Sequence, residues 1–548
     1  MHARMVRDLR RLADMRFDVV IVGAGFYGAV AAWDAVLRGL SVALIDKDDF
    51  GSGTSFNNLK TLHGGLRSLQ ALNFAQMRLF IRERRALARV APHLVQPLPF
   101  IIPTYRSPRR SAMLLRLALT INDLVARDRH EGLTDPSLHL PAGRMVPREE
   151  CLQLNAAIDP KGVTGGAIWY DYQLQNADRM TFSFIQSAAD AGATVANYAR
   201  AVRFLRDGEK VTGGRVEDRV TSEEFDVRAD VVLNAAGPWA AGLLETLGES
   251  ASSPAPKLSR AMNLVMRRAL GTHACGGLAN GRFLFLVPWR HVSIIGTSHD
   301  THEGGADALT VTRWDLEAFL ADAREAFPLA GFTAGDVRLI HRGLLPMLAS
   351  NGAHVNLLRE SVVVDHGTQY LPGVISMFGV RYTTARHTAA RAIDAVFRAK
   401  GVVTPPPCQT DRTPVAGGTI ANKEEFLRDV LLKDVQRLSP ETLRRLALTY
   451  GTAYEAILQL VRDMPVLGEP LGRHCNVTGA EILHAIRHEA AIKLTDVMIR
   501  RTEAGSAGHP GADALERAAY IMARQMGWDE WRTRNETAEV EAFYRLPV

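Results

Sequence analysis

The stretch FDVVIVGAGFYGAVAAWDAVLRGLSVALIDKDD, residues 17–49, decides the fold of this chain. An apolar strand leads into a glycine-rich turn, an alanine-rich helix follows, and a second apolar strand ends at Asp46. Gly23, Gly25 and Gly28 have the G-x-G-x-x-G spacing, which permits a tight turn and a close approach of backbone to a pyrophosphate. The helix N-terminus would face the phosphates, and the Asp46 carboxylate would accept hydrogen bonds from ribose hydroxyls. The stretch predicts a dinucleotide-binding βαβ unit rather than a glycine-rich turn without a ligand.

Two later segments predict that the dinucleotide is FAD. ADVVLNAAGPWA, residues 229–240, is a second buried strand that ends in a small-residue turn at Gly237. PGVISMFGVRYTTAR, residues 372–386, is a strand, a turn at Gly379 and a helix with Thr383 near its start. The N-terminal dipole of that helix favours negative charge on a reduced flavin ring. Three separate contributions to one ligand favour an extended FAD over NAD, which the first unit alone would usually bind.

The composition is that of a folded globular protein. A chain of 548 residues is too long for one simple core, and about three domains are expected. With 47% hydrophobic and 23% charged residues, disorder and coiled coil are excluded. The net charge of +6 is spread along the chain, whereas nucleic acid binding requires a concentrated basic face. We therefore expect no nucleic acid partner, and only a mild attraction to anionic substrates or lipid surfaces.

Cysteine usage and hydropathy indicate a cytoplasmic protein. The four cysteines lack CxxC or zinc-type spacing and are expected as buried free thiols in a reducing compartment: Cys151, Cys275, Cys408 and Cys475. His299 and His302 lie in a polar loop without a cysteine partner, so no metal site is expected. No apolar run of about 18 residues is present, and the start lacks the apolar core of a signal peptide. The basic residues 1–16 predict a short solvated helix, with contact to an anionic membrane surface as the alternative.

The stretch TSFNNLKTLHGGLRSL, residues 54–69, follows the βαβ unit directly. It resembles the FAD-dependent glycerol-3-phosphate dehydrogenase family, in which K..HGGLR.L follows the nucleotide-binding motif. RFLFLVPWRHVSIIGTS at 282–298, LNAAGPW, FGVRYTTAR and HEAAIKLTDVMIRRT at 488–502 match the same family pattern. The resemblance runs in order through residues 17–505, and the order and combination of the motifs make it specific.

The resemblance implies an α/β fold with a Rossmann-like two-lobed FAD-binding domain, an interleaved α+β substrate domain and an all-helical C-terminal domain. We expect the following boundaries: a basic N-terminal tail at 1–16, the FAD-binding domain at 17–80, 150–250 and 351–403, the substrate or cap domain at 81–149 and 251–350, a proline-rich linker at 404–421, and the helical domain at 422–548. The linker is expected to be semi-rigid because consecutive prolines favour extended backbone.

The same resemblance implies the cofactor-binding residues. Thr54 and Ser55 would meet the cofactor near its pyrophosphate, and Lys60 and His63 would line the flavin side. The alternative is a polar surface loop without a ligand. The full expected set is Gly23, Gly25, Gly28, Asp46, Thr54, Ser55, Lys60, His63, Gly64, Gly65, Gly237, Gly379 and Thr383.

In the family, a hydride passes from C2 of sn-glycerol 3-phosphate to flavin N5 while a base takes the hydroxyl proton, which gives dihydroxyacetone phosphate. Electrons then leave to a membrane quinone, or to oxygen in the oxidase branch. A bound phosphate requires fixed donors, and the resemblance places Arg67, Arg359 and Arg381 in the substrate pocket. Arg381 replaces a lysine of the family and would also stabilise negative charge on reduced flavin.

The identity of the base stays open at this stage. His63 is the first candidate by type, because an imidazole can accept a proton near neutral pH. Its alternative role is to fix the loop by hydrogen bonding to FAD or backbone. His341 is a second candidate. The expected catalytic set is therefore His63, Arg67 and Arg381.

The chain departs from the family pattern at Leu345, where the family has a substrate-contacting arginine before a proline. Losing such a contact to phosphate costs about 1.5–3 kcal/mol. Arg342 lies three residues earlier, which places it on the opposite face of an extended segment. Bulkier residues at 56–59 also replace small ones. The alternatives to glycerol-3-phosphate oxidation are therefore an FAD-dependent oxidase or dehydrogenase of another hydroxy or polyol compound, and a non-catalytic flavin-binding protein.

The segment SAMLLRLALTINDLVA, residues 111–126, has apolar residues at helical spacing. Such a stripe is usually buried in a core. Because the family has peripheral membrane members, the alternative is a stripe that faces lipid, with the protein at the inner face of the cell membrane.

Overall fold

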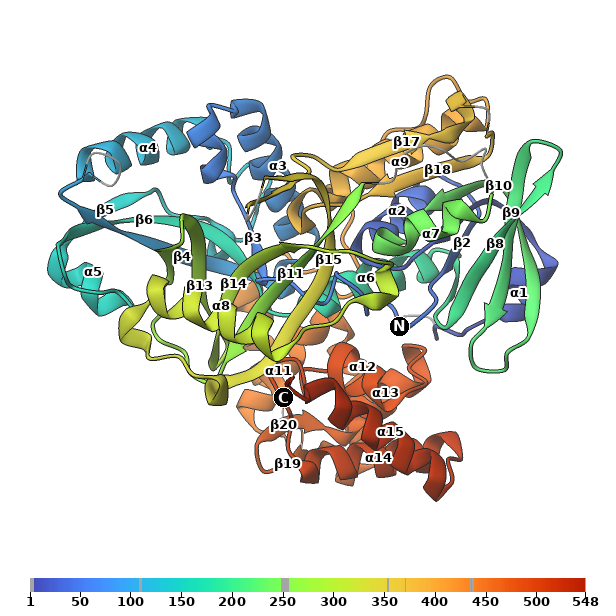
Figure 1. Ribbon diagram of the computed structural model, residues 1–548. Coiled ribbons are helices and arrows are strands. Elements are labelled where there is room, and N and C mark those ends of the chain that lie inside the picture. The colour runs from blue at the N-terminus through green and yellow to red at the C-terminus, as the bar shows by residue number, and fades with distance from the viewer. Residues whose placement is uncertain are drawn as a thin grey trace.

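Two β-sheets lie next to each other above a mainly helical C-terminal domain, as Figure 1 shows. This computed structural model describes residues 4–107, 111–247, 256–351, 354–369, 371–433, 435 and 438–547. The arrangement confirms the predicted α/β fold class with a second, interleaved domain.

The first sheet contains the βαβ unit. Strand β1 pairs in parallel with β2, as predicted from residues 17–49, and also with β10. The strand order of the first sheet is β17 (Val362–Asp365), β18 (Val374–Phe378), β10 (Glu224–Asn234), β1 (Arg16–Val22), β2 (Val42–Ile45) and β7 (Thr194–Ala196). An antiparallel ladder extends it from β10: β9 (Lys210–Asp218) and then β8 (Ala199–Asp207).

The β1 strand is apolar from Val19 to Val22 because both of its faces are buried there. On one face of the sheet, Val19 and Ile21 pack in the first hydrophobic core. On the other face, Phe17, Val20 and Val22 pack in a second hydrophobic core. This burial on two faces is typical of a parallel strand in an α/β protein. The covering helices are α2 (Phe26–Leu37), α6 (Ala177–Asp190) and α9 (Ala385–Ala399) on one face, and α1 (Leu9–Asp14) and α7 (Ala240–Glu245) on the other.

The turn between β1 and α2 touches the end of β10, and this contact requires glycine. Gly23 has a φ of +103°, and a Cβ built there would lie 2.5 Å from the carbonyl oxygen of Ala235. A Cβ on Gly28 would lie 1.8 Å from the carbonyl oxygen of Gly23. The G-x-G-x-x-G spacing therefore marks positions where backbone atoms are in direct contact, so that a side chain would not fit.

The second sheet is mainly antiparallel and forms the interleaved domain. Its order is β16 (His354–Leu357), β15 (Val337–Asn351), β11 (Lys257–Met266), β14 (Val292–Thr301), β13 (Arg282–Trp289), β12 (Ala274–Ala279), β4 (Val95–Tyr105), β6 (Val163–Leu174) and β3 (Thr61–Leu62), with β5 (Arg144–Pro147) beside β6. The helices of this region are α3 (Phe74–Val90), α4 (Ala112–Val125), α5 (Arg148–Leu154) and α8 (Arg313–Ala326).

The strand membership of the second sheet differs from the expected domain boundaries. Strands β3, β6 and β16 fall in segments that the sequence placed in the FAD-binding domain. The chain therefore crosses between the two sheets more often than the motifs indicate. Strand β6, for example, pairs with β4 of the second sheet along its full length. The expected boundary at residue 250 lies outside the described residues.

The C-terminal domain is helical apart from one two-stranded ribbon, so the expectation of an all-helical domain holds only in outline. Its helices are α10 (Lys423–Leu431), α11 (Pro440–Tyr450), α12 (Tyr454–Asp463), α13 (Gly479–His488), a π-helical turn (Asp496–Arg501), α14 (Ala512–Met526) and α15 (Glu530–Tyr544), and its ribbon is β19 (Pro470–Gly472) with β20 (Cys475–Thr478). Its core is continuous with the second sheet, because Trp289 and Ile294 pack with Leu494 and Val497.

The segment expected to be a semi-rigid linker and the segment expected to be a solvated N-terminal helix are both packed against the domains. The proline-rich segment 404–421 is anchored where the Val415 amide donates to the carbonyl of Val90 at 3.0 Å. In the N-terminal segment Leu12 is buried, and Arg7 donates to the Asp218 carboxylate at 2.6 Å. The linker and tail expected from composition are therefore parts of the folded structure.

A buried ion cluster joins the C-terminal domain to the loop after β2. Asp49 accepts hydrogen bonds from Arg500 Nε at 2.5 Å and from both Nη atoms of Arg501 at 2.9 and 2.7 Å. Arg500 also donates to Asp496, which accepts from the Tyr198 hydroxyl at 2.5 Å. Burial alone would raise the pKa of Asp49, but the two guanidinium charges hold it well below its usual range. We call Asp49, Asp496, Arg500, Arg501 and Tyr198 the Asp49 cluster.

Asp49→Ala should lower the free energy of unfolding by about 3–5 kcal/mol, because buried Arg501 loses its carboxylate partner and buried Arg500 is left with Asp496 alone in the cluster. Urea denaturation measures this loss. Glu539→Gln is the matched control, since the Lys493–Glu539 pair joins parts of the same domain in half-exposed positions and should contribute less than about 1 kcal/mol. Equal losses in the two variants would contradict a special role for the buried cluster.

Gly28→Ala should lower stability by about 1–3 kcal/mol, because the new methyl group overlaps the Gly23 carbonyl. Helix propensity alone predicts the opposite sign, since alanine is favoured over glycine in a helix by about 1 kcal/mol. Gly305→Ala is the control. Its Cβ would meet nothing within 4 Å, so its stability should stay within about 0.5 kcal/mol of wild type. A stabilised Gly28→Ala protein would refute the proposed contact.

Candidate active site

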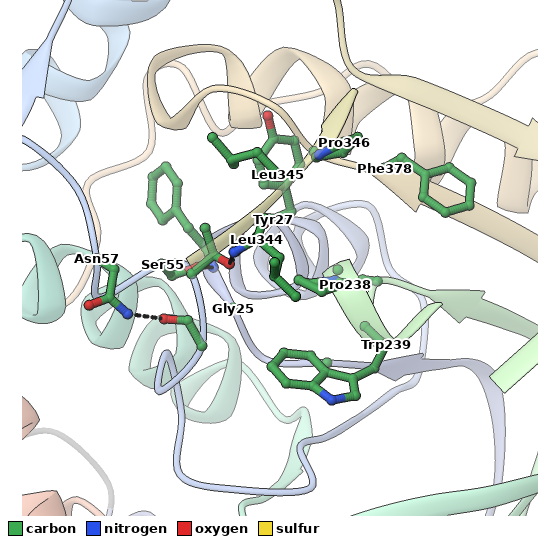
Figure 2. A pocket seen from close by; sticks show the side chains of 18 of the residues that line it. Gly25, Tyr27, Ser55, Asn57, Pro238, Trp239, Leu344, Leu345, Pro346 and Phe378 are labelled. Carbon is green, nitrogen blue, oxygen red and sulfur yellow. Dashed lines mark hydrogen bonds between the residues drawn. The ribbon is translucent and has the colours of Figure 1, made fainter. Parts of the chain in front are cut away.

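A cavity of about 650 Å³ lies between the first sheet, the second sheet and the loop that follows β2. Figure 2 shows residues from distant segments around it: Tyr27 of α2, Ser55 of the loop, Trp239 after β10, and Leu345 of β15. The volume is typical of sites for cofactors and small molecules.

The N-terminus of α2 faces the cavity. Gly25 is its N-cap residue and provides no side chain to cap the helix. The loop supplies one partner, because the Phe26 amide donates to Ser55 Oγ at 2.8 Å. Thr54 fastens the same loop to β15, where its hydroxyl donates to the Leu344 carbonyl at 3.1 Å. A helix N-terminus that faces a cavity and has no cap from its own N-cap side chain favours a phosphate group.

Asp46 follows β2 directly and lines the cavity. Its carboxylate accepts hydrogen bonds from the Ala24 amide at 2.6 Å and from the Asp48 amide at 3.0 Å. Burial raises the pKa of Asp46 to about 7, with a smaller contribution from the charges of Asp48 and Asp49. A carboxyl group that is so poorly solvated would gain from the hydroxyl donors of a ribose.

The opposite side of this part of the cavity is aromatic and polar. Gly237 lines it with a φ of +56°. The Trp239 indole donates to Asp307 at 2.7 Å, and Lys47 donates to the same carboxylate at 2.8 Å. The Lys47 ammonium also lies 4.1 Å from the centre of the Trp239 ring.

His63 lies at the other end of the cavity beside a buried carboxylate. Strand β3 pairs Leu62 with Tyr172 of β6, so the antiparallel register brings His63 opposite Asp171. The distance from His63 Nδ1 to Asp171 Oδ2 is 3.6 Å, and the His63 side chain is 42% exposed whereas that of Asp171 is 6% exposed. Arg84 and the Gly64 amide also donate to Asp171. Burial alone would raise the pKa of Asp171, but contacts with His63 and Arg84 keep it below its usual value.

Arg381 reaches the same end of the cavity from the turn after β18. Thr383 connects this turn to the loop that carries His63, because the Thr383 hydroxyl accepts a hydrogen bond from the His63 amide at 3.1 Å. The Arg381 guanidinium donates to the Arg359 carbonyl and lies 5.5 Å from the centre of the Phe80 ring. Burial lowers the pKa of Arg381, which indicates a cation that would gain from an anionic ligand.

Gly379 is needed at this turn because Tyr27 packs against it. A Cβ on Gly379 would lie 2.4 Å from the Tyr27 ring. The Tyr27 hydroxyl donates to the Arg381 carbonyl at 2.8 Å and accepts the Arg381 amide at 3.2 Å. Helix α2 therefore positions the turn that carries Arg381, a role for Tyr27 that the motif spacing did not indicate.

Besides Gly28, which contacts the Gly23 carbonyl as described above, three residues expected beside the cofactor lie outside the cavity wall. Lys60 is fully buried with a φ of +55°, and its ammonium donates to the Phe56 carbonyl at 2.7 Å. Gly64 and Gly65 lie behind the wall, where a Cβ would meet Arg84 at 2.2 Å or Phe80 at 3.0 Å. The two glycines therefore permit the close packing of α3, and the structure gives all three residues a supporting role.

Arg67 and Arg359, expected in the substrate pocket, are exposed and do not line the cavity. Arg67 lies close enough for its charge to lower the pKa values of Arg381 and His299. Arg359 contributes its carbonyl rather than its guanidinium to the site, because that carbonyl accepts from Arg381. Of the three expected basic residues, only Arg381 lies in the wall.

Leu345 lies in the cavity wall at the position where the resemblance implies an arginine. Arg342 faces a second, smaller cavity and does not replace it, in agreement with strand alternation. His341 is completely buried against Phe56, with ring centres 5.2 Å apart, and lies outside the wall. The structure therefore removes His341 as a candidate base.

Sequence reasoning missed the wall formed by the adjacent strands β11 and β14. Asn263, Thr297 and His299 line the cavity, and Thr297 Oγ1 donates to Asn263 Oδ1 at 2.8 Å. Alternation within IGTSH would place Thr297 and His299 on one face, but nothing local to this stretch shows which face borders the cavity. Asp171 was missed for a similar reason, since its partner His63 lies more than a hundred residues earlier.

These features fit an FAD molecule. The glycine turn leaves space that a Cβ would fill, the α2 N-terminus suits a pyrophosphate, and Asp46 suits a ribose. The cavity continues past Ser55 to His63 and Arg381, beyond the part that an adenosine diphosphate unit would use.

Comparison with protein families supports the same cofactor. Residues 18–387 match the family described as FAD dependent oxidoreductase. Residues 408–533 match the C-terminal domain of alpha-glycerophosphate oxidase.

Curated relatives and a solved structure extend over nearly the whole chain. A glycerol-3-phosphate dehydrogenase of Synechocystis sp. is 29% identical over 541 residues, with 96% of each chain covered. Glycerol-3-phosphate dehydrogenase 2 of Mycobacterium tuberculosis is 30% identical over 549 residues, with 97% of this chain and 89% of the relative covered. The structure of glycerol-3-phosphate dehydrogenase from Bacillus halodurans complexed with FAD has a TM-score of 0.76 at 24% identity, covering 97% of this chain and 95% of that chain, which shows a common fold.

Asp46→Ala should weaken FAD binding by roughly tenfold or more, because it removes a carboxylate acceptor for ribose hydroxyls. Titration of the deflavinated protein with FAD, followed by the quenching of flavin fluorescence, measures the dissociation constant. Asp230→Ala is the control, since Asp230 is paired with Lys400 away from the cavity and should leave the constant unchanged. Equal affinities for all three proteins would show that Asp46 does not contact the cofactor.

Proposed function

The chain belongs to the FAD-dependent glycerol-3-phosphate dehydrogenase family, and we propose that it oxidises sn-glycerol 3-phosphate to dihydroxyacetone phosphate. Both family matches, in the FAD-binding part and in the C-terminal domain, support the assignment. The observation that carries the proposal is the His63–Asp171 pair at the same end of the cavity as the Arg381 guanidinium. Oxidation of a phosphorylated alcohol requires both a proton acceptor and a cation for the phosphate.

His63 is proposed as the base. Bound FAD supplies the acceptor for the hydride from C2 of the substrate. His63 takes the proton of the C2 hydroxyl at Nε2, because Nδ1 is the nitrogen closer to Asp171. Asp171 orients the ring and stabilises the positive charge that develops on it, as a buried carboxylate does for other catalytic imidazoles. Arg84 and the Gly64 amide hold Asp171 in position.

His63→Asn should slow the reduction of bound flavin by glycerol 3-phosphate by about 100-fold or more, because the proton acceptor is lost. Anaerobic stopped-flow absorbance measures this rate. The variant should keep its FAD, since the contact of His63 with Thr383 is made by the backbone. His139→Asn is the control, because His139 stacks on His130 outside the cavity and should not affect the rate. A wild-type rate in His63→Asn would exclude this base.

Arg381 is proposed as the main phosphate ligand. It is the guanidinium that lies in the wall at this end, and Arg67 adds positive charge from nearby. Arg359 fixes the Arg381 guanidinium through its carbonyl, so we propose that it acts on the substrate only indirectly. With Leu345 in the same wall, the phosphate would have fewer charged partners than the family pattern provides.

Leu345→Arg should lower KM for glycerol 3-phosphate about tenfold, because a charge-assisted contact contributes about 1.5–3 kcal/mol. Steady-state kinetics with an artificial electron acceptor measures KM. Leu348→Arg is the matched control, since it adds the same charge to an exposed position of β15 that does not line the cavity. An unchanged KM in Leu345→Arg would contradict the view that the missing arginine limits substrate binding.

A second candidate function follows from the apolar character of the substrate end. Phe80, Leu345 and Leu357 all line the cavity there. This favours, as the alternative, an FAD-dependent oxidase or dehydrogenase of a less anionic hydroxy or polyol compound. Anaerobic incubation with phosphorylated and unphosphorylated polyols separates the candidates, because only the true substrate class bleaches the flavin. Bleaching by none of them would favour a non-catalytic flavin-binding protein.

The electron acceptor is proposed to be a membrane quinone, reached from the inner face of the cell membrane. Within the described residues no helix is both long and apolar enough to span a bilayer. Helix α4, at one end of the molecule in Figure 1, exposes Met113 at 83%, Leu117 at 56% and Leu124 at 68%. These residues lie on one helical face, which supports the lipid-facing alternative for this stripe over a buried one. Oxygen is the alternative acceptor.

Replacing Met113 and Leu117 together by glutamate should abolish sedimentation of the protein with vesicles of anionic phospholipid, because charged side chains oppose burial in the lipid interface. The control pair is Tyr520→Glu with Trp531→Glu, which changes two exposed apolar residues of the C-terminal domain. Wild-type protein that stays in the supernatant would contradict membrane contact through α4.

A further inference from the structure

His299 lies in the cavity wall and takes no part in the steps proposed for His63 and Arg381. Strand β11 pairs Ala261 with His299 of β14. Both residues line the cavity, together with Asn263 and Thr297 on the same strands. The four side chains therefore form one continuous wall, and His299 is its only imidazole.

The hydrogen bonding of this wall leaves His299 unpaired. Thr297 and Asn263 are bonded to each other at 2.8 Å. The His299 ring makes no hydrogen bond within the part of the chain that the structure describes, and its Nδ1 is buried. Buried polar groups in native proteins almost always have a partner. Because His299 also lines the cavity, a ligand or an ordered water there can complete the hydrogen bonding of the ring.

The surroundings of His299 keep the imidazole neutral. Burial, together with smaller contributions from the positive charges of Arg282 and Arg67, lowers the pKa of His299 to about 4. A neutral imidazole has one donor and one acceptor nitrogen, which suits a hydroxyl group that both donates and accepts. A phosphate dianion accepts only, and Arg381 is better suited to it.

We propose that His299 binds the terminal C1 hydroxyl of the substrate and thereby selects the glycerol backbone over analogues that lack this group. The inference rests on the proposed function. The phosphate is assigned to Arg381 and the C2 hydroxyl to His63, which leaves the C1 hydroxyl as the one polar group without a partner. Leu345 and Leu357 have no polar side-chain atom to offer it.

The test compares two substrates that differ only at C1: sn-glycerol 3-phosphate and (R)-propane-1,2-diol 1-phosphate. Wild-type kcat/KM should favour the first by roughly tenfold to hundredfold, the usual effect of one hydrogen bond to a desolvated group. His299→Leu should lower kcat/KM for glycerol 3-phosphate by the same factor and change that for the analogue less than about twofold. His299→Gln retains a donor and an acceptor and should restore part of the preference.

His302→Leu is the matched control. His302 lies just beyond the same strand, bonds the Gly305 carbonyl at 3.0 Å and does not line the cavity. Both substrates should keep their wild-type values in this variant. FAD content and thermal stability of each variant show whether the fold is intact. If the analogue reacts too slowly, the inhibition constants of dihydroxyacetone phosphate and hydroxyacetone phosphate give the same comparison.

Equal losses for both substrates in His299→Leu would overturn the inference, because His299 would then act on the phosphate or on the fold. A wild-type enzyme with no preference would overturn it as well. Both results leave the proposed function intact, since flavin reduction by glycerol 3-phosphate is seen directly. Failure of the wild-type flavin to be reduced by glycerol 3-phosphate would instead overturn the proposed function and this inference with it.

Discussion

The buried Asp49 carboxylate, held by Arg500 and Arg501, is the interaction on which the site depends most. Asp49 belongs to the loop that begins at Asp46 and ends near His63, so one segment carries both ends of the cavity wall. The two arginines come from the π-helical turn of the C-terminal domain. The C-terminal domain therefore does more than cover the second sheet, because it fixes the loop along which the cofactor would lie.

A second constraint is the pairing of β3 with β6. This two-residue strand carries the loop from the first sheet into the second, and its register sets His63 against Asp171. The hydrogen bond from the His63 amide to Thr383 then connects this point to the turn that carries Arg381. The proposed base His63, its neighbour Asp171 and the Arg381 guanidinium thus come from three segments. Each segment is positioned by backbone pairing or by a backbone hydrogen bond rather than by flexible side chains alone.

The sequence predicts best those features that are encoded locally. Gly23, Gly28 and Asp46 are recognisable because strand, turn and helix follow one another within one stretch. Lys60 lies outside the cavity wall, because its direction depends on a positive φ and on packing against Trp289, which no spacing reveals. Asp171 and His299 were missed because their positions follow from strand pairing between distant segments. Strands β3, β6 and β16 were likewise not assigned to the second sheet from the sequence, because nothing local to these strands shows which sheet they join.

A crystal structure of the protein with FAD and dihydroxyacetone phosphate would test the central claim most directly. The account predicts the isoalloxazine ring beside His63 and Arg381, the pyrophosphate at the α2 N-terminus, and the product between His63 and the β11–β14 wall. An FAD bound elsewhere, or a product that contacts neither His63 nor Arg381, would contradict it.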